Sequence, residues 1–328
     1  MGDPHVKPNN LEESDKLMDF VVGCSMTGMV DELVILGDLY DTHNIVRLEV
    51  IKFWNKWFQM LSSQCFKPQK RFRTIVLVGN HDISGNYSDD FSALHTAMPL
   101  ENEYFKIVSD PYLDGIYGYL PYIHSNEKFV EEANRLAEQG AKVLVSHPNF
   151  EGAVYDNGTG VVGGISPDLL SNDYTQLIGG HIHTQMEYGC VWYPGNSRWL
   201  TKSCANKEKG IWLVDHDDLT GKILKKIFVS TESVCTPIRS YIWREGEEQP
   251  QLAAASKNHI ELVGSSDWVT AQKKELSGVS ISSKITDIKK SKGRKSGKSL
   301  YEFLSNHYQA EPEKRQKLIS YMRDFNLV

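Results

Sequence analysis

The chain has 328 residues, of which 40% are apolar and 24% charged, as in a globular protein with one large or two modest cores. No apolar run approaches the roughly 20 residues that a membrane span needs, and the polar, acidic N-terminus is unlike a secretory signal. The net charge of −6 argues against a general nucleic-acid coat, and five cysteines without zinc-like spacing indicate free thiols in a reducing, cytoplasmic compartment.

The first two thirds of the chain alternate helical and strand patterns. Apolar residues at helical spacing predict helices over 11–29, 45–61 and 129–140. Short apolar, β-branched runs predict strands within 32–38, 73–82, 142–147, 175–183, 190–196, 210–215 and 222–230. This succession is typical of a layered α/β fold.

The sequence pattern changes at about Thr236, and from there on it predicts a small α+β module. A stretch without apolar residues, 289–299, follows and contributes to a local charge of +7 between Ala271 and Lys298. It is typical of a flexible linker, although a contact with a DNA backbone or an acidic partner is the alternative. Two short amphipathic helices are predicted last, over 299–308 and from Pro312. They are too small to fold alone and should dock on their own chain or on a partner.

The predicted strands end in metal-binding residue types. After these strands stand Asp38 and Asp41, the run Asn80, His81 and Asp82, then His147, and finally His181 and His183. In layered α/β folds ligands bind beyond the carboxyl ends of the strands. A lone Asp there is usually a turn residue, and "GNHD" alone could be a turn. Two histidines facing one side of a strand are a stronger signal, because they are costly in a core unless they bind something. A structural zinc site is the alternative, but the thiolates expected nearby are missing.

Mixed Asp, Asn and His ligands favour Mn, Fe or Zn over Ca or Mg. Two ions about 3.5–4 Å apart form the clamp used for in-line displacement at phosphorus, and they need a bridging carboxylate, for which Asp38 is the natural candidate. His81 would then be left to stabilise the phosphorane oxygens or protonate the leaving group. "DPH" at 3–5 is a further pair of ligand types, though no apolar strand precedes it.

Together these blocks resemble the calcineurin-like metallophosphoesterases, whose signature runs D-x-H, G-D-x-x-D, G-N-H-D/E, H and G-H-x-H. The matches are "DPH" (3–5), "GDLYD" (37–41), "GNHD" (79–82), "SHPNFEG" (146–152) and "GHIH" (180–183). The resemblance implies that one metal is held by Asp3, His5, Asp38 and His183 and the other by Asp38, Asn80, His147 and His181. It makes His81 the catalytic histidine and places Asp41 either near the substrate or just behind the metal ligands. The implied fold is a four-layer sandwich, two β-sheets flanked by helices.

Within that superfamily the chain looks most like the SbcD-type double-strand-break repair nucleases, notably the short recombination endonuclease subunits of T-even phages. "GYLPYI" (118–123), "WYPGNSRWLTKS" (192–203) and the order of the C-terminal segments carry this likeness. It implies a nuclease domain over 1–232, a DNA-binding capping domain over 233–288, a basic linker over 289–298 and a helix pair over 299–328.

The same resemblance implies an activity and partners. The activity would be manganese-dependent hydrolysis of DNA, as an exonuclease on duplex ends and an endonuclease on single strands, with Mg, Fe or Zn as alternative metals. The expected partners are DNA, an SMC-like coiled-coil ATPase of the SbcC type gripped by the helix pair, and a second copy of the chain. The expected location is the cytoplasm, or the host cytoplasm for a phage-encoded protein, with no membrane contact.

Two alternatives remain. One is another enzyme of the superfamily, a protein phosphatase or a small phosphodiesterase, although protein phosphatases favour GNHE with a following Arg and this chain has "GNHDISGNY". The other is a catalytically weak scaffold that holds an ATPase on DNA, because the strand expected before "DPH" is missing and its metal could bind weakly. We expect a shortened start, such as a misplaced initiation codon, with Asp3 and His5 still facing the metals. The place of the missing strand would be left empty or filled by another segment.

Overall fold

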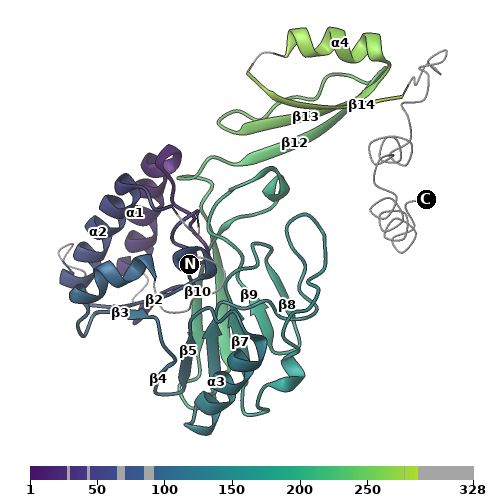
Figure 1. Ribbon diagram of the computed structural model, residues 1–328. Helices are drawn as coiled ribbons and strands as arrows, with labels where there is room; N and C mark the ends of the chain where they lie inside the picture. Colours follow the sequence, from purple (N-terminus) through teal and green to yellow (C-terminus); the bar gives the residue numbers. More distant parts are fainter. Residues whose placement is uncertain (28–29, 43–44, 65–70, 85–91, 277, 287–328) are drawn as a thin grey trace, which may run out of the picture. The chain divides into compact units, whose positions relative to one another are not determined.

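A computed structural model describes residues 1–286 except 28–29, 43–44, 65–70, 85–91 and 277 (Figure 1). The chain forms two compact units. The first comprises Met1–Trp243, Glu248–Glu261 and Gly278–Ser282. The described part of the second comprises 244–247, 262–276 and 283–286.

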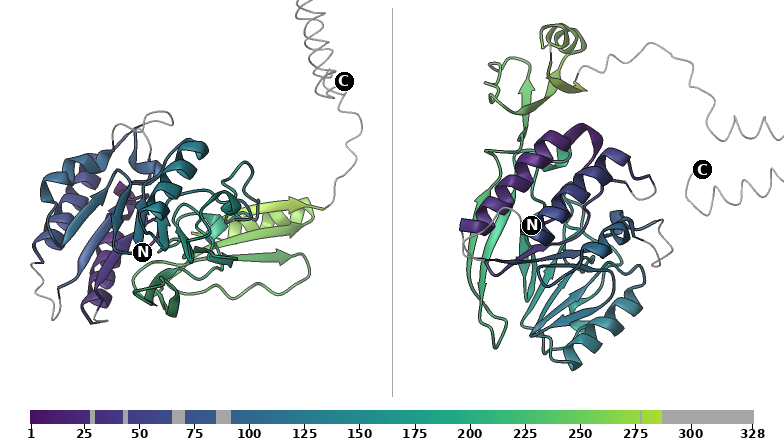
Figure 2. Two further views of the ribbon diagram at one scale, coloured as in Figure 1. Left: turned by 90° about the horizontal axis from the view of Figure 1, so that it is seen from below. Right: turned by 90° about the vertical axis from the view of Figure 1, so that its left-hand side faces the viewer.

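The first sheet of the first unit is parallel and has the order β1-β2-β3. Its strands are β1 (Glu32–Ile35), β2 (Arg73–Leu77) and β3 (Phe105–Val108). Side chains along the strands alternate between two cores, as the pleat requires. Val76 and Ile107 join a cluster with the helices α1 (Leu11–Thr27) and α2 (Leu48–Ser63), so these helices cover one face of the sheet (Figures 1 and 2).

The second sheet of this unit has the order β4-β5-β6-β7-β9-β8. Its pairs β5·β6, β6·β7 and β7·β9 are parallel, and both edge pairs are antiparallel. The strands are β4 (Tyr112–Asp114), β5 (Tyr117–Leu120), β6 (Val143–Ser146), β7 (Gln176–Gly179), β8 (Met186–Tyr188) and β9 (Val191–Tyr193). Helix α3 (Asn126–Glu138) packs on one face, where Phe129 and Leu136 meet Leu144 and Leu177.

The opposite faces of the two sheets share a third core. Ile75 and Leu77 from the first sheet pack with Val143, Val145 and Ile178 from the second. The antiparallel hairpin of β10 (Gly210–His216) and β11 (Ile223–Ser230) contributes to the same core. The protein is therefore a mixed α/β fold in which helices cover sheets, and the carboxyl ends of its parallel strands carry the candidate site.

The remaining regular elements follow the hairpin. Strands β12 (Ile238–Arg244), β13 (Lys257–Gly264) and β14 (Ser280–Ile285) form a three-stranded sheet in that order. Helix α4 (Ser266–Glu275) begins after Ser265, whose hydroxyl accepts a hydrogen bond from Trp268 N. The predicted linker and C-terminal helix pair lie outside the described residues.

Short 3₁₀ helices connect several of these elements: η1 (Pro8–Asn10), η2 (Asn80–Asp82), η3 (Ala93–Leu100), η4 (Pro167–Leu169) and η5 (Lys202–Cys204). In the described part of the chain, no helix combines the length and apolar character needed to cross a bilayer. The four cysteines described there, at 24, 190, 204 and 235, form no disulfide.

Candidate metal centre

The N-terminal segment and the ends of β1, β2, β6 and β7 bring eight of the nine predicted site residues into one cluster. They are Asp3, His5, Asp38, Asn80, His81, His147, His181 and His183. Asp41, the ninth, lies at the edge, where its carboxylate pairs with Lys7 at 3.2 Å. The cluster is assembled from segments far apart in the sequence, because parallel strands place their carboxyl ends at one edge of a sheet.

The N-terminal segment is held on two sides by main-chain hydrogen bonds. Leu36 N donates to Met1 O at 2.9 Å, and Val6 N donates to Leu39 O at 2.8 Å. On the other side Ser197 N donates to Gly2 O at 2.9 Å. The segment thus runs beside the end of β1 and carries Asp3 and His5 into the cluster.

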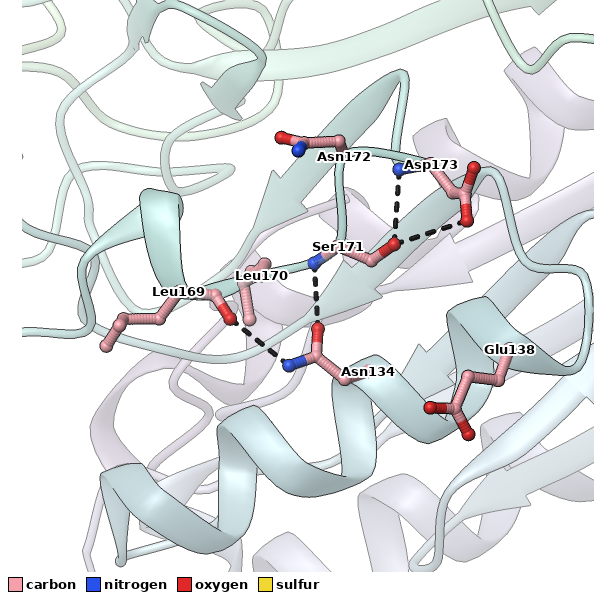
Figure 3. Close-up of a pocket in the computed structure, with 7 residues that line it drawn as sticks. All are labelled: Asn134, Glu138, Leu169, Leu170, Ser171, Asn172 and Asp173. Atoms are coloured by element: carbon pink, nitrogen blue, oxygen red, sulfur yellow. Dashed lines mark hydrogen bonds between the residues drawn. The ribbon is translucent and has the colours of Figure 1, made fainter.

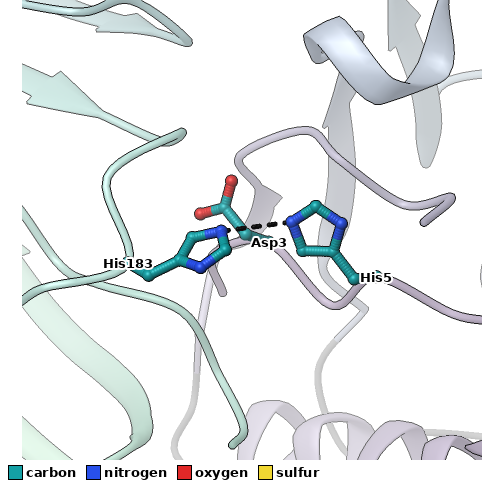
Figure 4. A group of neighbouring side chains, drawn as sticks. All are labelled: Asp3, His5 and His183. Atoms are coloured by element: carbon teal, nitrogen blue, oxygen red, sulfur yellow. Dashed lines mark hydrogen bonds between the residues drawn. The ribbon is translucent and has the colours of Figure 1, made fainter. Parts of the chain in front are cut away.

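One group of candidate ligands consists of Asp3, His5 and His183 (Figure 4). The Nε2 atoms of the two histidines lie 3.2 Å apart. Two nitrogen ligands about 2.0–2.1 Å from one tetrahedral ion would lie about 3.4 Å apart, so this spacing fits a shared ion. Asp3 Oδ1 accepts a hydrogen bond from His181 N at 2.8 Å, whereas Asp3 Oδ2 is buried without a hydrogen-bond partner among the described residues. A buried carboxylate oxygen of this kind fits a metal ligand.

The second group of candidate ligands consists of Asp38, His147 and His181, with Asn80 between the two rings. Asn80 Oδ1 lies 3.1 Å from His147 Nε2 and 2.7 Å from His181 Nδ1. His147 Nδ1 donates to Leu36 O at 2.5 Å, which leaves Nε2 as the ring nitrogen that faces the group.

Asp38 faces both groups. Its Oδ2 lies 3.5 Å from His5 Nε2, and its Oδ1 lies 3.3 Å from His147 Nε2. One oxygen therefore points to each half of the cluster, which is the arrangement that a bridging carboxylate requires. Oδ1 also accepts a hydrogen bond from His81 N at 2.9 Å, which fixes the orientation of the carboxylate.

Burial and neighbouring charge set the protonation of these groups. Burial lowers the pKa of His5 well below its usual value and lowers that of His181 to about 3, so both rings are held neutral, as metal ligands must be. Burial also raises the pKa of Asp3. Burial would likewise raise the pKa of Asp38, but the neighbouring His147 outweighs it and lowers that pKa well below the usual range. Burial alone would lower the pKa of His147, but Asp38 in turn raises it to about 9. Two carboxyl groups buried side by side favour a site that accepts cations.

His81 lies at the rim of this cluster. Its ring meets that of His5 edge-on with centroids 4.7 Å apart, and its Nδ1 donates to Asp41 O at 2.9 Å. The contact of Asp41 with His81 therefore runs through the main chain. His81 also falls within one candidate ligand group, with His5 and Asp38, so its position is compatible with ligation as well as with proton transfer.

Exposure differs across the cluster. Asp3, His5, Asp38 and His147 are buried, whereas Asn80, His81, His181 and His183 are partly exposed. The cluster therefore opens to solvent on the side of the partly exposed residues. A substrate would reach it from that side.

Backbone strain is concentrated at this site. Seven non-glycine residues in the described chain have positive φ, and four of them are predicted ligands: Asp3, His5, Asp38 and His181. Such conformations persist where the surrounding structure imposes them, and they cluster at functional sites. The surrounding structure therefore holds these four residues in strained backbone conformations that place their side chains in the cluster.

Two glycines allow the strand ends to approach each other. A Cβ at Gly79 would lie 2.3 Å from Asp38 N, and one at Gly180 would lie 2.3 Å from Leu36 O and 2.6 Å from His147 Nδ1. These distances leave no space for a side chain. The glycines before Asn80 and His181 are needed because neighbouring ligand loops touch there.

Asp82 is a positioning residue to which the sequence pattern assigns no role. Its Oδ1 accepts hydrogen bonds from Leu39 N at 2.9 Å and Tyr40 N at 3.0 Å, and its Oδ2 accepts one from Gly79 N at 2.9 Å. Burial raises the pKa of Asp82 to about 7. The residue joins the loop after β1 to the loop after β2. Its position as the last residue of "GNHD" is the sequence feature that could have indicated this role.

A surface hollow beside α3 is separate from the candidate metal centre (Figure 3). It is lined by Asn134, Glu138, Leu169, Leu170, Ser171, Asn172 and Asp173. Asn134 Nδ2 donates to Leu169 O at 3.1 Å, and Ser171 N donates to Asn134 Oδ1 at 2.7 Å. These contacts tie α3 to the loop before β7, so the hollow is explained by the structure of that loop.

Comparisons with known proteins agree with this geometry. The sequence model of a family described as calcineurin-like phosphoesterase matches residues 1–185. "Putative phosphoesterase 244L" of Invertebrate iridescent virus 6 is 27% identical over 208 residues, which cover 60% of this chain and 68% of that protein. "Putative phosphoesterase 078R" of Invertebrate iridescent virus 3 is 25% identical over 207 residues, which cover 60% of this chain and 56% of that protein.

Calcineurin-like phosphoesterases bind divalent metals, and the Asp, Asn and His donors assembled here suit such ions. The matched region covers more than half of the 328 residues and contains every strand end that contributes to the cluster. The chain therefore belongs to the calcineurin-like phosphoesterase family and is a phosphoester hydrolase of the metallophosphoesterase type.

Proposed function

We propose that the chain is a metal-dependent DNA nuclease, the nuclease subunit of a DNA repair and recombination complex of the SbcCD type. It would hydrolyse phosphodiester bonds as an exonuclease on duplex ends and as an endonuclease on single strands. The observation that carries the proposal is the pair of ligand groups that share Asp38, with His81 at their solvent-facing rim.

The residues of the cluster have distinct tasks. Two divalent ions, when bound, would supply the charge that stabilises the attacking and leaving oxygens of an in-line displacement at phosphorus. Asp3, His5, Asp38 and His183 would hold one ion, and Asp38, Asn80, His147 and His181 the other. His81 donates Nδ1–H to Asp41 O, so its Nε2 is the nitrogen that exchanges a proton with the substrate. Asp41 fixes the His81 ring through that carbonyl.

Two segments that resemble SbcD-type nucleases flank the cluster, which supports DNA as the substrate. Tyr122 of "GYLPYI" stacks near His181 with ring centroids 6.5 Å apart and lies 6.4 Å from the ring of His147. Asn196 of "WYPGNSRWLTKS" donates from its main-chain N to His183 O at 3.3 Å. Aromatic side chains beside a phosphodiester site can stack on bases of a single strand.

The proposal includes the metal and the partners. Manganese is the expected ion, with Mg, Fe or Zn as alternatives, because the mixed donors suit these metals. The capping module would bind DNA, the C-terminal helix pair would bind an SMC-like coiled-coil ATPase of the SbcC type, and the chain would form a homodimer. We also propose that the helix-covered sheets form the four-layer sandwich of this family and that the protein acts in the cytoplasm.

The test compares substrates with the full-length chain in manganese. End-labelled duplex DNA, circular single-stranded DNA and p-nitrophenyl phosphate are each incubated with wild type and with His81→Asn, with and without a coexpressed ATPase of the SbcC type. The proposal expects degradation of both DNA forms by wild type and a rate lower by about 10²–10⁴-fold in the variant. Preference for the small monoester over both DNA substrates would overturn the nuclease assignment.

A second candidate is a phosphoesterase that acts on a smaller substrate. The names of both viral relatives specify a phosphoesterase and no DNA substrate, and the aligned part covers only 56% of the second relative. This candidate uses the same cluster and the same ions. The substrate comparison above separates it from the nuclease.

A further inference from the structure

The two ring nitrogens of His183 face different surroundings. Its Nε2 faces His5 Nε2 across 3.2 Å, inside the candidate metal centre. Its Nδ1 faces away from the centre, toward the Asp156 carboxylate, whose Oδ2 lies 3.9 Å away. That distance exceeds a direct hydrogen bond. The Cys204 thiol contacts both this Asp156 oxygen, at 2.9 Å, and the His183 side chain.

Asp156 is held firmly on the far side of its carboxylate. Its Oδ1 accepts hydrogen bonds from Thr184 Oγ1 at 2.9 Å, Lys207 Nζ at 2.9 Å and Lys209 Nζ at 3.5 Å. Lys209 is only 1% exposed and also donates to His183 O at 2.7 Å. Because these donors occupy Oδ1, Oδ2 is the oxygen presented to the His183 side.

Cys204 contacts both Asp156 and His183. It is fully buried, and its Sγ donates to Asp156 Oδ2 at 2.9 Å. Since a thiol has one hydrogen, which Cys204 gives to Asp156, its sulfur can only accept from His183, and Nδ1 is the ring nitrogen on the Asp156 side. A proton held on Nδ1 in this way leaves Nε2, which faces the metal centre, as the ligating nitrogen.

The other half of the centre orients its histidine differently. His147 Nδ1 donates to Leu36 O, a main-chain carbonyl that a side-chain substitution leaves in place. The corresponding contact of His183 is made by side chains alone. The two halves can therefore be perturbed separately.

We propose that Cys204 and Asp156 are positioning residues for His183, fixing its tautomer and ring orientation and so the affinity of the Asp3–His5–His183 half for its ion. The inference rests on the proposed two-metal centre. Partners on the non-ligating nitrogen of a metal-binding histidine typically change metal affinity by about 10–100-fold when removed. Only one of the two binding events should respond.

The test is isothermal titration of chelator-treated, full-length chain with Mn²⁺. Wild type should show two binding events. Cys204→Ala and Asp156→Asn should keep one event unchanged and weaken the other by about 10–100-fold. Cys204→Ser should stay close to wild type, because a hydroxyl also donates and accepts. His183→Ala marks the loss of the half-site.

Cys235→Ala is the matched control, because Cys235 is another buried cysteine of the same hydrophobic cluster. It should bind both ions with wild-type affinity, and an equal loss there would overturn the inference by assigning the effect to packing. If Cys204→Ala and Asp156→Asn bind both ions normally while His183→Ala loses one, the inference fails and the metal centre stands. If wild type binds fewer than two ions, both fail. Should Asp156→Asn not fold, the two Cys204 variants decide.

Discussion

Asp38 Oδ1 lies 3.3 Å from His147 Nε2, while the other oxygen of the same carboxylate faces His5 in the opposite half of the centre. This relationship predicts that Asp38→Asn weakens the binding of both ions, because a neutral amide removes a negative charge that they share. Titration with Mn²⁺ measures it. Asp41→Asn is the control: its carboxylate pairs with Lys7 and should leave both events intact. A single lost event in Asp38→Asn would contradict the bridging role.

His81→Asn should separate metal binding from catalysis. The His81 ring lies at the rim with its Nδ1 on Asp41 O, so its removal should leave the metal content of the protein unchanged. The rate constant kcat should fall by about 10²–10⁴-fold, the usual contribution of a general acid or base. Elemental analysis and single-turnover rates measure the two effects. His216→Asn, on β10, should change neither, and loss of metal from His81→Asn would instead identify His81 as a ligand.

The ligand cluster can be predicted from the sequence, because each ligand is marked by a pattern of a few neighbouring residues. Apolar runs followed by Gly and then Asp, Asn or His are visible at Asp38, Asn80 and His181, and parallel strands bring such ends together. Cys204 and Asp156 carry no such signal. Their roles depend on which loops meet at His183, and that is decided by contacts between distant segments.

The attachment of the N-terminal segment also depends on contacts with distant segments, which sequence patterns do not predict. The residues before Asp3 have no strand pattern, so the sequence predicts a loose attachment. Its main-chain hydrogen bonds reach Leu36 on one side and Ser197 on the other, and main-chain pairing of this kind leaves no trace in side-chain composition. The expectations for the linker and the C-terminal helix pair fall outside the described residues and stay predictions.

Gly180→Ala should disturb the centre through its backbone. The added Cβ would lie 2.3 Å from Leu36 O and 2.6 Å from His147 Nδ1, which are themselves hydrogen-bonded. We expect a loss of about 1–3 kcal/mol in the free energy of unfolding and weaker binding of one Mn²⁺ ion. Urea unfolding and titration measure these effects.

Gly23→Ala is the matched control for that substitution. Gly23 lies within α1, and apart from its chain neighbours and the backbone of its own helix, a Cβ added to it would meet no described atom within 4 Å. Alanine should therefore raise the free energy of unfolding by about 0.5–1 kcal/mol. Replacing Gly with Ala is therefore expected to lower the free energy of unfolding at position 180 and to raise it at position 23. Equal destabilisation by both variants would contradict the close approach at Gly180.

Tyr174 should make stability depend on alkaline pH. Burial raises the pKa of its phenol, which donates to Ala133 O. The neutral form is therefore favoured in the folded state, and the stability it confers is complete below the unfolded pKa of about 10. As pH rises above that value the unfolded chain releases the proton first, and the free energy of unfolding should fall by about 1.4 kcal/mol per pH unit from this group. Urea unfolding of wild type and Tyr174→Phe at pH 8 and about pH 10.5 measures this dependence. At pH 8 the variant should be less stable than wild type by about 1 kcal/mol. At the higher pH this difference in the free energy of unfolding should shrink. A difference that stays constant between the two pH values would show that Tyr174 ionises equally in both states.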